Sequence, residues 1–399
     1  MPHTRNRHAI QQVLKKLKFF RVISLQGARQ TGKSFLAREL LPSILSSYKY
    51  ETLDQRQTRQ FIEKNPESFL EKHGDFKTLA MDEAQKAPDL FEAVKLKVDV
   101  NTRPGQYILL GSTEFSREVR VKEALTGRLG RVRIFPFNFA ETQSLPPNLT
   151  KNACLIQKVP RAERKMFLRY LDHGGFPGIF HIREPEARSE LMNGWLKLVI
   201  ERDLLQFIHL RMEIDTELCD EILIRAATSG EPTIAWFSKE LGVSARKIQK
   251  HIKLLEQLFV LHKLMPHSLG SGKQRYLLCD PGLATHLGAS FHRQLETALW
   301  LEQLSQHSYR GGVEYRLRYY RGTRGGIIDL VVEDKARQVW ALKIISEEGY
   351  DQRDFEILRA FETKAKASGL KVQGLYALAP TREATTLNCV QVFPWESIL

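Results

Sequence analysis

The chain has 399 residues, of which 42% are hydrophobic and 27% charged, with a formal net charge of +14. This length allows two or three domains that each bury a core, and the composition is that of a globular protein. No apolar run approaches the ~18 residues that span a bilayer and the basic start lacks an apolar targeting segment, so we expect a cytoplasmic protein with no membrane partner. Four cysteines without CxxC spacing argue against a zinc site and a disulfide framework. The positive charge favours an anionic partner such as nucleic acid, although a merely basic surface is the alternative.

The hydrophobic pattern divides the chain into three units. Residues 22–140 alternate short apolar runs with helical stretches, which is typical of a parallel α/β sheet, whereas 160–265 are mainly helical. From about 276 onward, a helix precedes the strands YRLRYY, IIDLVVE, QVWALKII and VQGLYAL, and FEILRAFETKAKASG forms a helix between the last two. We predict an α/β protein with a P-loop domain (1–150), a helical region (151–275) containing a winged helix-turn-helix at about 228–278, and a smaller α/β domain (276–399).

GARQTGKS, residues 27–34, matches the phosphate-binding pattern G-x-x-x-x-G-K-[ST], with the strand RVISLQ before it and the helix SFLARELL after it. Backbone N–H groups and the helix dipole would bind phosphate oxygens. Lys33 would reach the β and γ phosphates, and the Ser34 hydroxyl would ligate Mg²⁺. We therefore predict ATP and Mg²⁺ as cofactors, bound by Gly27, Ala28, Arg29, Gln30, Thr31, Gly32, Lys33, Ser34 and Phe35.

TLAMDEAQ, residues 78–85, predicts a buried strand that ends in an acidic pair. Asp82 would bind Mg²⁺ through water, and Glu83 would orient or deprotonate the attacking water. The alternative is an acidic cap at a strand-to-helix turn. Beside a phosphate-binding loop, the pair favours hydrolysis over simple nucleotide binding.

YILLGST, residues 107–113, predicts the next buried strand, and Ser112 at its end would sense the γ-phosphate or hold the water. An ordinary strand cap is the alternative. Arg128 and Arg131 flank a later glycine-containing turn. Arg128 would stabilise charge on the transferred phosphoryl group, in cis or from a neighbouring subunit, unless this pair is only a solvated surface.

Taken in chain order, GARQTGKS, TLDQRQTRQFIEKNPESFL, MDEAQKAPDLF, LLGSTEF and LTGRLGRVRIFPFNFAE resemble a widespread prokaryotic family of AAA+-type ATPases. The similarity continues through LDHGGFPGIF and WLKLVIERDLLQF and covers nearly the whole chain. It implies Mg-ATP as ligand, assembly into rings or other homo-oligomers, and a C-terminal winged helix followed by a restriction-endonuclease-like fold. The biological role of the family is poorly defined.

TIAWFSKELGVSARKIQKHIKLLEQLFVLHKL, residues 233–264, predicts a helix-turn-helix in which Ser244 caps the second helix. The wing would be HSLGSGKQRYLL. A recognition helix needs a basic face to reach phosphates and base edges. The predicted DNA contacts are Arg246, Lys247, Lys250 and Lys253 on the helix and Lys273 and Arg275 on the wing. A protein-docking module or a solvated charged face would show the same pattern.

RGGIIDLVVEDKARQVWALK, residues 324–343, resembles the centre of a metal-dependent nuclease of the PD-(D/E)xK class. Such centres hold Mg²⁺ with carboxylates on adjacent strands, while a lysine positions the nucleophile. Asp329, Lys343 and, on the preceding helix, Glu296 mark the expected positions, but Ala341 stands where the second strand carboxylate belongs. We therefore expect a retained scaffold with a degenerate centre.

These patterns support one leading hypothesis and two alternatives. The first is an oligomeric ATPase that couples Mg²⁺-dependent ATP hydrolysis to binding or remodelling DNA, for example branched DNA, or to translocation along it. The second is a nucleotide-gated switch or scaffold for a protein partner. The third, an active Mg²⁺-dependent nuclease, is disfavoured by Ala341.

Overall fold

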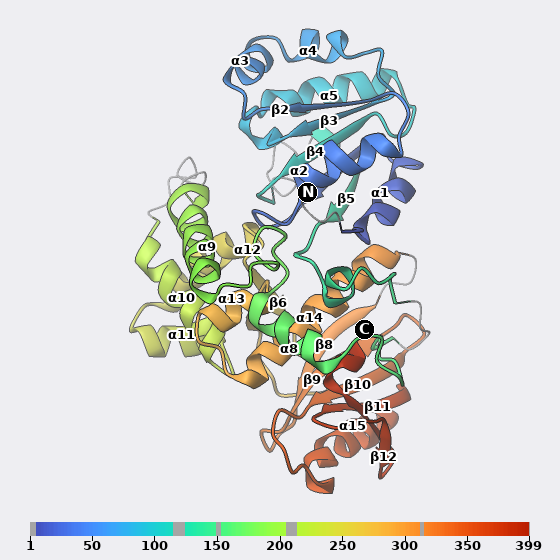
Figure 1. The fold of residues 1–399 in the computed structure, drawn as a ribbon, viewed down its shortest axis with the longest axis vertical. Coiled ribbons are helices and arrows are strands. Elements are labelled where there is room, and N and C mark those ends of the chain that lie inside the picture. Colours follow the sequence, from blue (N-terminus) through green and yellow to red (C-terminus); the bar gives the residue numbers. More distant parts are fainter. Residues whose placement is uncertain (1–4, 115–123, 149–152, 205–213, 312–314, 399) are drawn as a thin grey trace.

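The computed structural model describes residues 5–114, 124–148, 153–204, 214–311 and 315–398. Figure 1 shows an N-terminal sheet at one end, a second sheet at the other end, and a helical region beside them. Among the described residues, no helix combines the length and low polarity needed to cross a bilayer.

The N-terminal sheet contains five parallel strands in the order β2-β3-β4-β1-β5. The strands are β1 (Val22–Gln26), β2 (Tyr48–Thr52), β3 (Thr78–Asp82), β4 (Tyr107–Gly111) and β5 (Leu129–Arg133). β1 and β3 are buried along their whole length, as expected for a parallel sheet covered on both faces. The predicted parallel sheet is confirmed.

Helices surround this sheet and connect its strands: α1 (Ala9–Leu17), α2 (Lys33–Phe35), α3 (Arg56–Lys64), α4 (Pro66–Lys72) and α5 (Asp89–Val100). The single helix predicted after the phosphate-binding loop is composite, because α2 continues as a π-helical stretch, Leu36–Leu40, and a 3-10 turn, Leu41–Ser43. Pro42 lies in that last turn, where its missing N–H prevents further α-helical bonding.

The middle of the chain is mostly helical. Its elements are α8 (Arg164–His173), α9 (Pro185–Lys197) with a π-helical extension (Leu198–Asp203), α10 (Thr216–Thr228), α11 (Ile234–Leu241), α12 (Ala245–Gln257), β6 (Leu261–Leu264), β7 (Arg275–Leu278) and α13 (Pro281–His286). Ile248, Ile252 and Leu255 place one face of α12 in the core, and the Ser244 side chain accepts a bond from the Lys247 N–H, as predicted. β6 and β7 pair antiparallel next to α12.

The C-terminal part begins with the long helix α14 (Phe291–Arg310) and contains a mixed sheet in the order β12-β13-β11-β10-β9-β8. Its elements are β8 (Arg316–Arg321), β9 (Ile327–Glu333), β10 (Gln338–Ile344), α15 (Glu356–Ala367), β11 (Lys371–Ala379), β12 (Thr385–Leu387) and β13 (Val390–Pro394). The four strands predicted from the sequence and the helix between the last two are present. β8, β9 and β10 pair antiparallel, whereas β11 follows α15 and pairs parallel to β10.

Helix α14 joins the two sheets. The Tyr309 hydroxyl accepts a bond from the Phe135 N–H at 3.0 Å, and the Glu302 carboxylate accepts one from the Phe139 N–H at 2.7 Å. Phe139 begins the short helix α7 (Phe139–Thr142), which follows the N-terminal sheet. A single apolar core contains Leu25 from that sheet, Leu299 from α14 and Leu330 from the C-terminal sheet. The first and last units of the chain therefore pack against one helix.

Candidate nucleotide-binding site

The predicted nucleotide-binding residues meet at one edge of the N-terminal sheet. β1, β3 and β4 run parallel and lie side by side, so their carboxyl ends share this edge. Gln26 at the end of β1 pairs in register with Gly111 at the end of β4. The loop that starts at Gly27, the acidic pair Asp82–Glu83 and Ser112 are therefore neighbours, and open α/β sheets bind ligands at this edge.

The backbone of the phosphate-binding loop requires its glycines. Gly32 has φ 86°, in the left-handed region, and Gln30 also has a positive φ of 60°. A Cβ on Gly27 would lie 2.0 Å from the Ile134 carbonyl oxygen, so only glycine fits there. The loop thus turns tightly between β1 and α2, which lets its N–H groups face a phosphate.

Lys33 is buried at the centre of this loop. Its ammonium donates to the carbonyl oxygens of Gly27 at 2.9 Å and Ala28 at 2.7 Å, which leaves one N–H for a ligand. Burial lowers the pKa of Lys33 to about 8, whereas Asp82 and Glu83 act in the opposite direction and favour the charged form. A nucleotide phosphate would supply the further negative charge that a buried ammonium needs.

Asp82 and Ser34 offer oxygen donors of the kind that Mg²⁺ takes. Asp82 is 4% exposed; its carboxylate accepts bonds from the Tyr50 hydroxyl at 2.6 Å and the Glu83 N–H at 2.9 Å. Tyr50 also interacts with the Ser34 side chain. Tyr50 therefore connects the two predicted metal residues, so the donor set fits Mg²⁺. The sequence analysis missed this tyrosine because nothing in the strand YKYET marks it.

Glu83 is held at the turn after β3 in a strained conformation, with φ 56°. Its carboxylate accepts a bond from the Gln85 amide at 2.5 Å. Burial, and secondarily the charge of Asp82, raise the pKa of Glu83, whereas Lys33 and Lys86 oppose the shift. A carboxylate with a raised pKa is a stronger proton acceptor, which suits the predicted base.

Ser112 lies directly after β4, as predicted, and is 3% exposed. Its hydroxyl has no hydrogen-bond partner in the described part of the chain. A buried hydroxyl without a hydrogen-bond partner is energetically costly. Because Ser112 lies at the nucleotide edge of the sheet, a phosphate oxygen or a water could supply the missing bond.

The structure corrects the prediction for Arg128 acting in cis. The Arg128 carbonyl oxygen accepts a bond from the Val22 N–H, so Arg128 lies at the start of β1 and β5, across the sheet from the phosphate-binding loop. Its guanidinium pairs with Asp99, with Nη2–Oδ2 at 2.9 Å. Within one chain, Arg128 therefore has no access to the phosphates.

The N-terminal segment and the helical region contribute residues to the site that no local pattern in the sequence marks. Arg29 of the phosphate-binding loop donates to both carboxylate oxygens of Asp203, and the Trp195 indole donates to the Arg29 carbonyl oxygen at 3.1 Å. Arg7, 5% exposed, lies near Gly32: a Cβ on that glycine would be 4.0 Å from an Arg7 nitrogen and 3.5 Å from Pro177. These contacts are long-range in sequence, so no local pattern predicts them.

The predicted DNA contacts occupy two different environments. Arg246, Lys247, Lys253 and Lys273 are exposed, and Lys250 is half-buried. Lys247 forms an ion pair with Asp215 at 2.7 Å. The prediction for Arg275 is wrong: it is 3% exposed and donates to Glu296, because it lies in β7 with its side chain directed into the core.

Two residues of the predicted nuclease centre, Asp329 and Lys343, interact electrostatically, whereas the third forms its ion pairs elsewhere. Glu296 faces Arg275 and Arg293, with which it forms a buried ion-pair cluster, so its place in that centre is corrected. Asp329 accepts bonds from His292 and from the Ile344 N–H at 2.6 Å, and Lys343 donates to the Ile327 carbonyl oxygen. Among the described residues, no group of three or more His, Cys, Asp or Glu side chains could hold a metal ion.

Comparison with known proteins gives two family matches. Residues 20–143 match a family described as an AAA domain, and residues 164–295 match one described as a domain of unknown function. With the geometry of the phosphate-binding loop, the first match supports an AAA-type P-loop ATPase domain in this part of the chain.

Individual relatives are distant. Uncharacterized proteins of Mycobacterium tuberculosis and Mycobacterium bovis are each 23% identical over 254 residues, covering 64% of this chain and 52% of the relative. The chain thus spans about half the length of these curated relatives. Similar solved structures include the Walker-type ATPase of Pyrococcus abyssi (15% identity, TM-score 0.41, 70% of this chain and 94% of that one). The RuvB Holliday junction branch migration motor of Thermotoga maritima is another, with 15% identity and a TM-score of 0.29; the match covers 63% of this chain and 89% of that one.

Proposed function

We propose that this protein is an oligomeric ATPase that couples Mg²⁺-dependent ATP hydrolysis to binding or remodelling DNA. One contact carries the coupling: the Glu114 N–H donates to the Gln257 carbonyl oxygen at 2.9 Å. Glu114 follows Ser112 and Thr113 at the nucleotide edge of the sheet, and Gln257 is the last residue of α12, the helix with the basic face. A shift of the strand end on nucleotide binding would reach α12 through this hydrogen bond.

The residues of the site divide the hydrolysis between them. The loop N–H groups and Lys33 would bind the β and γ phosphates, Ser34 and Asp82 would hold Mg²⁺, and Tyr50 fixes Asp82. The Glu83 carboxylate would accept a proton from the water that attacks the γ phosphorus, while the bond from that phosphorus to the β,γ-bridging oxygen breaks and ADP leaves. Ser112 would hydrogen-bond the phosphoryl oxygen or the water. Mg²⁺, when bound, neutralises charge on the β and γ phosphate oxygens.

The oligomer completes the site in this proposal. Arg128 lies at the sheet edge opposite its own phosphate-binding loop and would act only on the nucleotide of a neighbouring subunit. Its ion pair with Asp99 holds the guanidinium at the surface, where a neighbour would meet it. An arginine supplied in trans stabilises transition-state charge on the transferred phosphoryl group.

The DNA-binding part of the proposal rests on the order α10-α11-α12-β6-β7, which we interpret as a winged helix. Arg246 and Lys253 project from the exposed face of α12, and Lys273 lies in the segment between β6 and β7. We interpret the C-terminal order α14-β8-β9-β10-α15-β11 as a nuclease-like scaffold without cleavage. A metal at this centre would need the Asp329 carboxylate, which already accepts hydrogen bonds from His292 and from the Ile344 N–H.

The test is ATP turnover measured with Mg²⁺ across duplex, branched and single-stranded DNA, with particle size determined with and without ATP. We expect at least one DNA structure to raise turnover, and DNA affinity to fall steeply with salt. If no DNA changes the rate and binding does not depend on salt, the DNA role is lost while the ATPase remains.

A nucleotide-gated switch that binds a protein partner is the second candidate. Two observations favour it: Asp215 neutralises Lys247, and Arg275 is buried, so the basic face is smaller than the sequence suggested. In that case the rate of ATP hydrolysis would set how long the protein stays in its ATP-bound state. Turnover that responds to no DNA, in a protein that still hydrolyses ATP, would select this function.

A further inference from the structure

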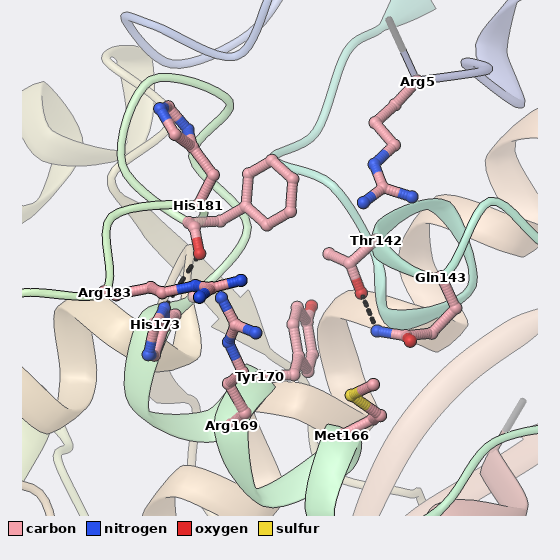
Figure 2. Close-up of a pocket in the computed structure, with 11 residues that line it drawn as sticks. Arg5, Thr142, Gln143, Met166, Arg169, Tyr170, His173, His181 and Arg183 are labelled. Atoms are coloured by element: carbon pink, nitrogen blue, oxygen red, sulfur yellow. Dashed lines mark hydrogen bonds between the residues drawn. The ribbon is translucent and has the colours of Figure 1, made fainter. Parts of the chain in front are cut away.

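A pocket of about 370 Å³ lies against α8 and the loop that follows it and is lined by basic side chains (Figure 2). Three arginines and two histidines line it: Arg5, Arg169, Arg183, His173 and His181. None of the described residues that line it is an aspartate or a glutamate. The nearby carboxylate of Asp172 accepts a bond from Arg188 at 2.6 Å and lies 3.6 Å from the ring of His173, so it offsets part of the positive charge. This volume is within the range of sites for small ligands, and the charge selects an anion.

Two of these arginines, both exposed, have no partner among the described residues. The guanidinium groups of Arg169 on α8 and Arg183 on the following loop make no hydrogen bond or ion pair with any described residue. In Figure 2 the side chains of Arg169 and Arg183 lie on one side of the pocket, and Arg5 enters from the other side. Like charges repel, so three guanidinium groups around one pocket, with no carboxylate among its described lining residues, are suited to a multiply charged anion. Planar guanidinium groups bind phosphate oxygens in pairs.

The remaining wall is apolar. Phe180, Met166 and Tyr170 line the same pocket; Tyr170 is 3% exposed, and its hydroxyl donates to the Phe137 carbonyl oxygen at 3.1 Å. The Arg5 guanidinium lies 5.7 Å from the centre of the Phe180 ring. A ligand with a ring or another apolar part attached to its phosphate would use both surfaces, whereas inorganic phosphate would use only the arginines.

The loop between α8 and α9 contributes residues to this pocket and also lies near the nucleotide site. His173 closes the loop through a bond to the Phe180 carbonyl oxygen at 2.8 Å. On its other side, Pro177 packs near Gly32, and Phe176 packs on Trp195, whose indole binds Arg29. No residue from 27 to 35 lines the pocket. Occupancy of the pocket would therefore be transmitted to the phosphate-binding loop by a shared segment.

We propose that this pocket binds a small phosphate-bearing molecule, distinct from the nucleotide at Lys33, and that its occupancy changes nucleotide affinity. The ligand class is an organic phosphate with an apolar or ring-containing part. This inference goes beyond the proposed function and does not require ATP hydrolysis or DNA binding.

The experiment uses 4-nitrophenyl phosphate as the probe and titration calorimetry of the whole protein. We expect one equivalent to bind in both the wild type and the Lys33→Ala variant, which removes the lysine of the nucleotide site. Arg169→Ala and Arg183→Ala should each weaken binding by about tenfold or more, since each removes hydrogen bonds to a charged group. Lys165→Ala, a control on the exposed face of α8 outside the pocket, should bind normally. Equal binding by the Arg169→Ala/Arg183→Ala double variant would overturn the proposal.

A second titration, with a non-hydrolysable ATP analogue and Mg²⁺, separates this pocket from the nucleotide site. If the sites are distinct and coupled, the affinity for the probe reaches a new constant value as the analogue saturates, and the probe changes the affinity for the analogue by the same factor. Probe binding that declines without limit as the analogue concentration increases would mean one shared site. An unchanged affinity for the analogue would overturn the coupling. If an oligonucleotide displaces the probe at concentrations below the dissociation constant of the probe itself, the pocket belongs to nucleic acid and the small-molecule ligand is overturned.

Discussion

Asp203 binds the guanidinium of Arg29 through both carboxylate oxygens, with Nε–Oδ2 at 2.7 Å, although 174 positions separate the two residues in the chain. One belongs to the phosphate-binding loop and the other to the end of the α9 helix extension. Asp203 is 1% exposed, so this pair is shielded from solvent on the carboxylate side. The conformation of the nucleotide loop thus depends on the helical region.

Asp203→Ala should destabilise the protein by about 1.5–3 kcal/mol, since hydrogen bonds to charged groups contribute that much. It should also weaken ADP binding, because Arg29 is released from its place in the loop. Thermal unfolding and ADP titration measure the two effects. Glu201→Ala removes an exposed carboxylate from the same stretch and should change neither. If the effects of Arg29→Ala and Asp203→Ala are additive in the double variant, the two residues are not coupled.

Glu83→Gln should retain nucleotide binding and lower ATP turnover by about 10²–10⁴-fold, the usual contribution of a general base. Glutamine fills the same space but cannot accept the proton. Steady-state turnover and a binding titration with the ATP analogue check this. Glu92→Gln, on the exposed face of α5, is the matched control and should turn over normally. Undiminished turnover in Glu83→Gln would remove that residue from the mechanism.

ADP binding should depend on the protonation of Lys33. Burial lowers the pKa of its ammonium to about 8. Below pH 8 the group is charged and attracts phosphate, whereas above pH 8 the free protein holds a neutral amine. ADP affinity should therefore change little from pH 7 to 7.5. Above pH 8 it should decrease, and the decrease should approach about tenfold per pH unit. Calorimetric titration between pH 7 and 9.5 measures this. Lys33→Arg stays charged and should show no such decline; a level wild-type affinity up to pH 9.5 would contradict the prediction.

Glu296→Ala should lower stability by about 3–5 kcal/mol, because it leaves the buried guanidinium groups of Arg275 and Arg293 without their counter-ion. The thermal unfolding midpoint should fall by on the order of 10 °C. Glu296→Gln keeps the shape and one acceptor and should be intermediate. Normal stability in Glu296→Ala would show that the glutamate does not anchor this cluster, and would reopen a role at the degenerate nuclease centre.

Arg246→Glu combined with Lys253→Glu should weaken DNA binding and reduce the slope of log affinity against log salt by about two units. Both side chains are exposed on α12. The control is Lys364→Glu with Lys371→Glu, which makes the same charge change on exposed positions of the C-terminal domain. Affinities measured between about 50 and 200 mM salt decide the result, because phosphate contacts weaken strongly over this range. Equal loss in both double variants would indicate a general charge effect.

The sequence by itself determined the nucleotide loop, the acidic pair and the strands that carry them. These features are local: a strand, a glycine-rich turn and a helix follow one another, and short apolar runs mark buried parallel strands. The position of Ser112 also followed from the end of its strand. The role of Tyr50 was not predicted because it depends on the pairing of β2 with β3, which places the Tyr50 hydroxyl 2.6 Å from Asp82.

Only the tertiary structure decided the partners of the charged side chains. Arg275 and Glu296 are expected from the sequence at separate sites, a DNA surface and a nuclease centre, yet they bind each other in the core. Arg128 proved to be at the wrong edge of the sheet for its own nucleotide, because β5 runs parallel to β1 and Arg128 precedes it. A charge pattern does not state whether a side chain faces solvent or another charge. The environment of a charged side chain depends on packing between segments far apart in the chain. Burying Arg275 or Glu296 without a partner would be too costly, so the two are buried together.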